Sequence, residues 1–306
     1  MDETGRVARV AVVIRTKDRP ELLRRAFRSI VGQTFGEWEA VVVNDGGDAA
    51  AVDALIAAQP EGVRERFRAV HAETSRGRWV SANAGVLATT APLLVLHDDD
   101  DSWHPEFLER AAAYLDAHPE RQGVVSRIQI VWEKLVEGRL RTVRKEIFEE
   151  GLPVPTLSDE LLYNRFVPIG FLYRRALHEE LGLYDESLPV VGDWAFYLKV
   201  LARGSLEYLG ETPYAYWHQR ERSEGAESNS VIGASGDHAK YDALIRERAL
   251  REYVEEHGLG LVLYLTKYID QRLEETEFRV RHEVRKFNPV ERVYQKLRTM
   301  REQRRG

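Results

Sequence analysis

The first hundred residues alternate short apolar runs with segments of helical periodicity. Apolar side chains fill Val7–Ile14, Trp38–Val43 and Leu93–Leu96, with a shorter run at Phe67–Val70. After Pro20, apolar residues recur every three to four positions, which is the spacing of an amphipathic helix. Strands that alternate with helices in this way predict an α/β fold in which helices cover both faces of a largely parallel sheet.

The second half of the chain is less regular. Residues 221–238 are rich in Ser, Gly, Glu and Asn, a composition typical of a loop. The pattern from Ala239 onward is helical, with a break at Gly258 and Gly260. We therefore expect a main domain at 1–220, a loop at 221–238 and a helical extension at 239–306. Other predicted elements are helices at 48–58, 78–87, 158–164, 174–181 and 193–201, and strands at 123–132, 139–148 and within 204–216.

Acidic side chains follow three of the predicted strands. Asp18, Asp45 and the run Asp98-Asp99-Asp100-Asp101 each come directly after an apolar run. Ligands of parallel α/β sheets bind beyond the carboxyl ends of the strands. We therefore expect these carboxylates to converge at one edge of the sheet and to form the functional site there.

The four-residue acidic run favours a metal site. Neighbouring carboxylates repel one another, and a divalent cation removes that penalty. Alternation along a strand would point Asp98 and Asp100 to the same side, giving two hard oxygen ligands suited to Mg²⁺ or Mn²⁺ with a phosphate as co-ligand. The alternative is a solvated acidic loop or a helix N-cap, with Asp101 or Ser102 capping a helix that starts near Pro105.

Composition narrows the class of protein further. The 306 residues contain 44 Lys and Arg against 50 Asp and Glu, a net charge of -6, which disfavours nucleic-acid binding. There are no cysteines, so disulfides and thiolate metal sites are excluded. No apolar stretch approaches the roughly 20 residues that span a bilayer, and the acidic start is unlike a signal peptide. These features predict a cytoplasmic protein.

Several segments together resemble one enzyme family, the family-2 glycosyltransferases. The resemblance covers roughly the first 220 residues and implies the nucleotide-sugar-binding GT-A fold with a mixed central sheet. The segments that carry it are Val12–Pro20, Ser29-Ile30, Gln33-Thr34, Val42–Gly46, Asn83–Gly85, Leu96–Trp103, Leu181–Glu186, Gly192–Trp194 and Tyr216–His218.

The resemblance implies roles for the acidic residues. Thr16 and Asp18 would lie beside the nucleotide base, and Asp45 would accept a hydrogen bond from it. The alternative role of Asp45 is that of a turn residue before Gly46-Gly47. Asp98 would hold the ribose or the metal, and Asp100 the metal and through it the diphosphate. Asp99 could replace either of them, because the register within the run is open by one residue. The implied cofactor is Mn²⁺ or Mg²⁺.

Asp193 matches the family's general base, which gives a single displacement with inversion at the anomeric carbon. Its alternative role is a helix N-cap.

His218 matches a histidine near the metal or pyrophosphate, or it is a satisfied, partly buried residue. Arg220 and Arg222 could clamp the diphosphate, and the favoured alternative is that they belong to a solvated basic loop. The implied donor is a UDP or dTDP sugar, and the implied acceptor is a cell-envelope glycan or related glycoconjugate. The competing hypothesis is a non-catalytic nucleotide-sugar-binding module.

Two positions depart from the family pattern. Ala82 stands where relatives often carry arginine before the asparagine, and Arg76 or Arg78 could supply that charge from upstream. Gly192 stands where the family usually has glutamate before the base. We include Arg78 among the expected nucleotide-binding residues.

The extension at 239–306 lies outside the resemblance. Leu259–Ile269 is its most apolar stretch, and its last 36 residues contain more basic than acidic side chains. Such helices can pack on the main domain, associate with a second copy, or lie on an anionic membrane surface. Because the basic charges are interspersed with glutamate, packing or self-association is favoured over peripheral membrane contact.

Overall fold

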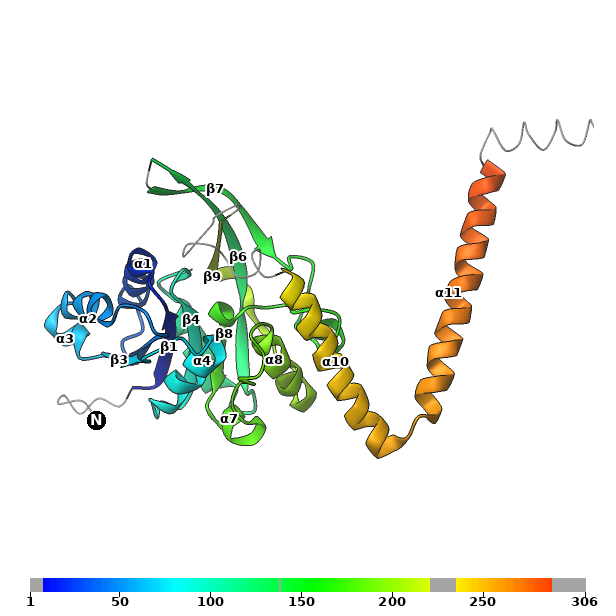
Figure 1. The fold of residues 1–306 in the computed structure, drawn as a ribbon. Helices are drawn as coiled ribbons and strands as arrows, with labels where there is room; N and C mark the ends of the chain where they lie inside the picture. The colour runs from blue at the N-terminus through cyan, green and yellow to red at the C-terminus, as the bar shows by residue number, and fades with distance from the viewer. Residues whose placement is uncertain (1–7, 138, 221–234, 288–306) are drawn as a thin grey trace, which may run out of the picture. The chain divides into compact units, whose positions relative to one another are not determined.

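The computed structural model describes residues 8–137, 139–220 and 235–287 (Figure 1). The chain divides into two compact units, Met1–Asp242 and Ala243–Gly306. The first unit contains the sheet and every residue predicted for the functional site. The described part of the second unit is helical.

A mixed sheet forms the centre of the first unit. Within the described residues it has nine strands, ordered β3-β2-β1-β4-β8-β6-β9-β5, with β7 paired to β6. In chain order the strands are β1 (Val10–Thr16), β2 (Trp38–Asn44), β3 (Phe67–His71), β4 (Leu93–Asp98), β5 (Ser102–Trp103), β6 (Gly123–Val136), β7 (Arg139–Phe148), β8 (Phe171–Arg174) and β9 (Tyr208–Arg220).

The first four strands in the chain are parallel, as the sequence pattern predicts. β1 lies between β2 and β4, and every residue of β1 is buried, as expected for a strand covered on both faces. In the register, Thr16 lies opposite Asn44 and Arg15 lies opposite Asp98. The carboxyl ends of β1, β2 and β4 therefore meet at one edge of the sheet.

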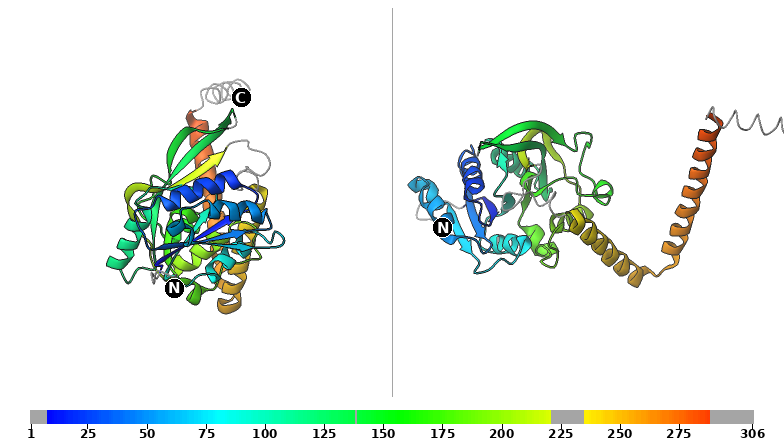
Figure 2. Two further views of the ribbon diagram at one scale, coloured as in Figure 1. Left: turned by 90° about the vertical axis from the view of Figure 1, so that its left-hand side faces the viewer. Right: turned by 45° about the horizontal axis from the view of Figure 1, so that its top comes forward.

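The remaining strands make the sheet mixed. β8 is antiparallel to both β4 and β6, whereas β9 runs parallel to β6. β6 continues past the predicted strand end at Trp132 to Val136 and forms a long hairpin with β7. Figure 1 and the left view of Figure 2 show the distal half of this hairpin extending beyond the other strands.

Helices cover the sheet, and most begin where the sequence pattern predicts. Asp48 caps α2 by accepting hydrogen bonds from the N–H groups of Ala50 and Ala51. The helices are α1 (Pro20–Val31), α2 (Ala49–Ala57), α3 (Glu61–Arg64), α4 (Arg78–Leu87), α5 (Phe107–Ala117), α6 (Leu157–Glu160), the 3₁₀ turn η1 (Pro168–Gly170), α7 (Ala176–Leu181) and α8 (Gly192–Arg203).

Two predicted helix boundaries are wrong. α5 begins at Phe107 with Glu106 at its cap position, so neither Asp101 nor Ser102 caps it. α6 ends at Glu160, whereas the sequence pattern extended that helix to Asn164.

The described C-terminal part contains two long helices. α10 (Ser235–His257) begins within the stretch predicted as a loop, and α11 (Gly260–Phe287) follows the break at Gly258, whose φ of 74° ends the first helix. Among the described residues, no helix combines the length and apolar character needed to cross a membrane.

Candidate active site

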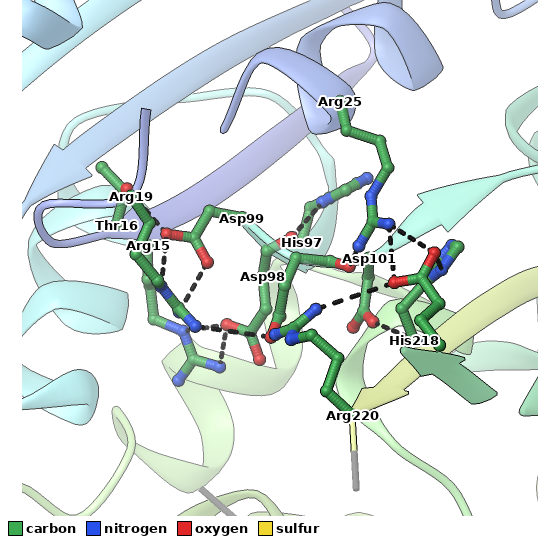
Figure 3. A network of polar contacts seen from close by, with 12 residues as sticks. Arg15, Thr16, Arg19, Arg25, His97, Asp98, Asp99, Asp101, His218 and Arg220 are labelled. Atoms are coloured by element: carbon green, nitrogen blue, oxygen red, sulfur yellow. Dashed lines mark hydrogen bonds and ion pairs between the residues drawn. The ribbon is translucent and has the colours of Figure 1, made fainter. Parts of the chain in front are cut away.

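In the acidic run at the end of β4, Asp99, Asp100 and Asp101 are buried and Asp98 is partly exposed, and arginines contact the run (Figure 3). Asp98 is the last residue of β4, and its Oδ1 accepts hydrogen bonds from Nε and Nη2 of Arg15 at 2.9 and 2.6 Å. Asp101 Oδ1 accepts the backbone N–H of His218 at 3.0 Å. The alternative of a solvated loop or helix cap is therefore wrong.

Asp99 and Asp100, the central two carboxylates, contact β1, the cap residue of α1 and the end of β9. Thr16 Oγ1 donates to Asp99 Oδ2 at 2.7 Å, and Arg19 Nη2 lies 2.5 Å from Asp99 Oδ1. Arg220 Nη2 donates to Asp100 Oδ2 at 2.6 Å, and Arg19 reaches the same oxygen at 3.4 Å. Segments more than 100 residues apart in the chain thus meet on this run.

His218 lies beside this network and is engaged on both sides of its ring. Nε2 is 2.7 Å from Ser102 Oγ, and Nδ1 is 3.0 Å from Glu133 Oε1. Glu133 also accepts two hydrogen bonds from Arg25 Nη1, at 2.8 and 2.9 Å. Burial works against ionisation of Glu133, but its contacts with His218 and Arg25 prevail and lower its pKa to about 2.

The negative charge of the run is only partly compensated. Burial raises the pKa of Asp99 to about 7 and holds the pKa of Asp101 well above its ordinary value. The pKa of Asp98 is lowered, because Arg15 and Arg78 outweigh the effect of burial. A cation added to this edge would relieve the charge repulsion that remains.

The residues fit a divalent cation only together with substrate ligands. Within the described residues, no group of three or more His, Asp or Glu side chains is arranged to hold a metal ion. Asp98 and Asp100 provide two carboxylates, and Mg²⁺ is commonly bound by one or two carboxylates plus substrate phosphates and water. His218 as a metal ligand stays a prediction, since both its ring nitrogens face protein groups.

Asp45 lies at the same edge, directly after β2, and organises the loop before α4. Its Oδ1 accepts the N–H of Arg76 at 2.8 Å. Its Oδ2 accepts the hydroxyl of Ser75 at 2.7 Å and the N–H of Gly77 at 3.1 Å. Burial raises the pKa of Asp45, but these hydrogen bonds prevail and lower it. Contact with a nucleotide base stays a prediction.

Thr16 and Asp18 line a cavity of about 240 Å³ between β1, α1 and α2. Asp18 has a φ of 54°, and its carboxylate accepts the N–H of Asp48 at 2.9 Å. The cavity is smaller than the roughly 300–1,000 Å³ of pockets that enclose a complete ligand, so it suits one part of a larger molecule.

Asp193 enters the site from α8. It is the second residue of that helix, and Val191 occupies the cap position, so Asp193 is not the N-cap. Asn164 Nδ2 donates to Asp193 Oδ2 at 3.1 Å. Burial raises the pKa of Asp193, while the Trp194 N–H and the nearby charges of Arg15 and Arg78 oppose the rise. Because both arginines also act on Asp98, the base candidate and the acidic run share one site.

The position of Trp79 explains why residue 192 is glycine and not the glutamate that the family usually has before the base. A β-carbon on Gly192 would lie 2.6 Å from the Trp79 ring, so only glycine fits while the indole is there. The Arg15 guanidinium lies 4.9 Å from the same ring. The indole is 3% exposed, and its N–H has no hydrogen-bond partner in the part of the chain that the structure describes.

Asn83 fixes the segment that leads to α8. Its Nδ2 donates to Tyr184 O and to Glu186 Oε1, each at 2.9 Å, and its Oδ1 accepts the Tyr184 N–H at 3.0 Å. Asn83 therefore holds residues 184–186, in the segment that precedes α8. The positive charge that is absent at Ala82 is present at Arg78, at the start of α4, where it acts on Asp98 and Asp193.

The sequence patterns missed several residues of the site. Arg15 could have been found as a buried cation in a Val-rich strand, and Glu133 as an acidic residue following an apolar run. Nothing in the local pattern distinguishes Arg25, Trp79 or Asn164. Arg222 lies outside the described residues.

The fold belongs to a known class. The UDP-GlcNAc complex of S. aureus TarS aligns with 72% of this chain and 61% of its own, with a TM-score of 0.56 and 23% identity. The mannosyltransferase PcManGT of Pyrobaculum calidifontis, in complex with GDP-Man and Mn²⁺, aligns with 89% of this chain and 83% of its own, with a TM-score of 0.53 and 16% identity. The predicted GT-A-like α/β fold with a mixed sheet is confirmed.

The sequence itself identifies the family. The profile for glycosyl transferase family 2 matches residues 11–182, more than half of the chain. The chain belongs to glycosyl transferase family 2. The uncharacterized glycosyltransferase YwdF of Bacillus subtilis is 28% identical over 275 residues, 89% of this chain and 92% of that protein. A PGL/p-HBAD biosynthesis glycosyltransferase of Mycobacterium tuberculosis is 28% identical over 198 residues, 64% and 71% of the two chains.

Proposed function

We propose that this glycosyltransferase moves a sugar from a UDP or dTDP sugar to a hydroxyl group of a glycan or glycoconjugate, with inversion at the anomeric carbon. Family membership supports the transferase class. Two proteins with this fold bind nucleotide sugars, UDP-GlcNAc in one and GDP-Man in the other, which supports a nucleotide-sugar donor. We further propose a role in cell-envelope polysaccharide synthesis and assign the transfer to residues 1–220.

The observation that carries this proposal is the position of Asp193 relative to the acidic run. Its charge acts on Arg15, and Arg15 is hydrogen-bonded to Asp98 at the end of β4. A donor whose diphosphate lies at the end of β4 would therefore present its sugar toward α8. This is the arrangement that direct displacement requires, with the base on the acceptor side.

Asp193 acts as the general base. An acceptor hydroxyl becomes a competent nucleophile when its proton is removed, and a carboxylate with a raised pKa is better matched to that task at neutral pH. Burial supplies the raised pKa, and Asn164 orients the carboxylate through its hydrogen bond to Oδ2. With one base and no covalent intermediate, the acceptor attacks from the face opposite the leaving diphosphate, and the configuration inverts.

The nucleotide is bound at the ends of β1, β2 and β4. Thr16 and Asp18 line the cavity that would take the base, and Asp45 is the acceptor for a base N–H. Asp98, on which the charge of Arg78 acts, and Asp99, which binds Thr16, follow at the end of β4. Arg19 and Arg220 would meet the diphosphate charge, because both already bind carboxylates of the run.

Asp98 and Asp100 would hold Mn²⁺ or Mg²⁺, with His218 as the neighbouring imidazole. A divalent ion there offsets negative charge on the departing diphosphate.

The test is donor hydrolysis and transfer by Asp193→Asn. We expect a loss of about 10²–10⁴-fold in kcat with UDP or dTDP binding retained, since the substitution removes the base and little else. Full activity in Asp193→Asn would overturn the assignment of the base. If neither nucleotide stabilises the protein against heat with or without Mn²⁺, the proposed donor class is wrong.

A further inference from the structure

The distal part of the β6–β7 hairpin has properties that the active site does not use. We call residues 134–137 and 139–145 the basic arm. It begins directly after Glu133, whose carboxylate binds Arg25. From there it extends beyond the other strands of the sheet (Figures 1 and 2). The arm has five Lys and Arg and one Glu, within a chain whose net charge is -6.

Strand pairing gathers the cations on one face of the arm. Residues directly opposite in an antiparallel pair share a face, and residues two apart on one strand do so as well. Lys134 lies opposite Arg141, Val136 opposite Arg139, and Trp132 opposite Arg144. The four cations Lys134, Arg139, Arg141 and Arg144 therefore lie on the same side.

This arrangement is unfavourable in the isolated protein. Like charges placed directly opposite one another destabilise a sheet, and Lys134 and Arg141 form such a pair. In the described parts of the chain, neither of them has an ion-pair or hydrogen-bond partner, and the same holds for Arg139. An anionic partner would supply the missing counter-charge.

The basic face points away from the nucleotide site. Glu133 lies on the other side of β6, where its carboxylate binds Arg25 and the His218 ring. Successive strand residues point to opposite faces, so Lys134 faces the opposite side from Glu133. The cations are therefore not arranged to hold the donor diphosphate.

Exposed apolar side chains accompany the cations. Val136 lies on the basic face, opposite Arg139, and is 39% exposed. Leu135, on the other face of the same hairpin, is 62% exposed, and Val143 is 53% exposed. Apolar groups beside Lys and Arg match a bilayer surface, where apolar side chains enter the headgroup region while cations bind lipid phosphates. A nucleic acid or a soluble polyanion would gain nothing from these three residues.

We propose that the basic arm binds the surface of a membrane rich in anionic phospholipid. Two properties together favour a membrane surface as the partner. The hairpin has unpaired cations on one face, and it also exposes leucine and valine side chains. This assignment is independent of the proposed transfer reaction. It also differs from membrane contact through the C-terminal helices, which the sequence pattern raised as an alternative.

The test uses the full chain and sedimentation with vesicles of phosphatidylcholine, with or without about one-third phosphatidylglycerol. We expect binding only to the anionic vesicles, and a loss of at least about tenfold in Arg139→Glu/Arg141→Glu. Leu135→Ser/Val136→Ser should also weaken binding. Arg64→Glu/Arg68→Glu is the matched control, because it makes the same charge change on exposed residues of α3 and β3.

Four results would overturn the proposal. The first is equal binding by the wild type and Arg139→Glu/Arg141→Glu. The second is an equal loss in the Arg64/Arg68 control, which would indicate a general charge effect. The third is loss in Arg279→Glu/Arg281→Glu on α11 with the arm variant unaffected, which would assign the contact to the C-terminal helices. Undiminished binding by Leu135→Ser/Val136→Ser, together with competition by polyphosphate, would instead identify a soluble polyanion as the partner.

Discussion

The indole of Trp79 packs directly against Gly192, at a distance that leaves no room for a β-carbon. Gly192 precedes the proposed base, and the same indole contacts the guanidinium of Arg15. The aromatic ring thus bridges α4, β1 and the start of α8. The glutamate that relatives usually carry before the base is incompatible with tryptophan at position 79.

Gly192→Glu should therefore destabilise the protein by about 1–3 kcal/mol, the usual cost of overpacking a close contact. Trp79→Ala alone should cost about 3–5 kcal/mol, because it leaves a cavity. In the double variant the glutamate has room, so the combined cost should be less than the sum of the two. Urea unfolding of all four proteins measures this coupling, and strictly additive costs would show that the two residues do not compete for space.

Glu160 should make the protein less stable as the pH rises. The residue is fully buried, and burial raises its pKa from 4.5 to about 8. Between these two values the folded protein keeps a proton that the unfolded chain has released, so stability falls with increasing pH. At about 1.4 kcal/mol per pKa unit, the loss by pH 8 is on the order of 3–5 kcal/mol.

Glu160→Gln keeps the shape and removes the titration. The variant should be more stable than the wild type at pH 8, and its unfolding free energy should vary less between pH 5 and pH 8. Glu120→Gln, a change at an exposed position, serves as the control. If urea denaturation gives parallel pH profiles for the wild type and Glu160→Gln, Glu160 does not titrate in this range.

The parallel half of the sheet could be predicted from sequence because its signals are local. Valine-rich runs followed at once by Asp45 and Asp98 mark strands and their carboxyl ends, and Asp48 and Gly258 mark helix boundaries. Sheet topology then brings the acidic residues to one edge. None of these steps requires knowledge of distant contacts.

The arginines that contact the acidic run could not be predicted in the same way. The charge of the run alone predicts a metal ion, yet Arg15 and Arg220 bind Asp98 and Asp100 directly. These partners are 83 and 120 residues apart in the chain. Hydrophobic periodicity reports which face of an element is buried and contains no information on which charged side chains will meet.

Chelation should abolish transfer if the acidic run works with a divalent ion. We expect activity to fall at least about 100-fold in EDTA and to return with Mn²⁺ or Mg²⁺, because charge on the leaving diphosphate would otherwise be unbalanced. UDP or dTDP should raise the melting temperature more with Mn²⁺ than without it.

That metal-dependent difference should vanish in Asp98→Asn/Asp100→Asn and persist in Asp116→Asn, a change at an exposed residue paired with Arg9. Full transfer in EDTA would show that arginines such as Arg19 and Arg220 suffice for the diphosphate.

Asn164→Ala should shift the pH dependence of transfer. The Asn164 amide donates to Asp193 Oδ2 and so favours the ionised carboxylate. Burial already raises the pKa of Asp193 above 3.8, and loss of this donor should raise it further. The base works only when deprotonated, so the acidic limb of the kcat profile should move to higher pH while the plateau falls less than about tenfold.

Ser158→Ala, at an exposed position of α6, should leave the limb in place. A uniform fall in kcat at every pH, with no shift of the limb, would mean that Asn164 supports the fold rather than the base.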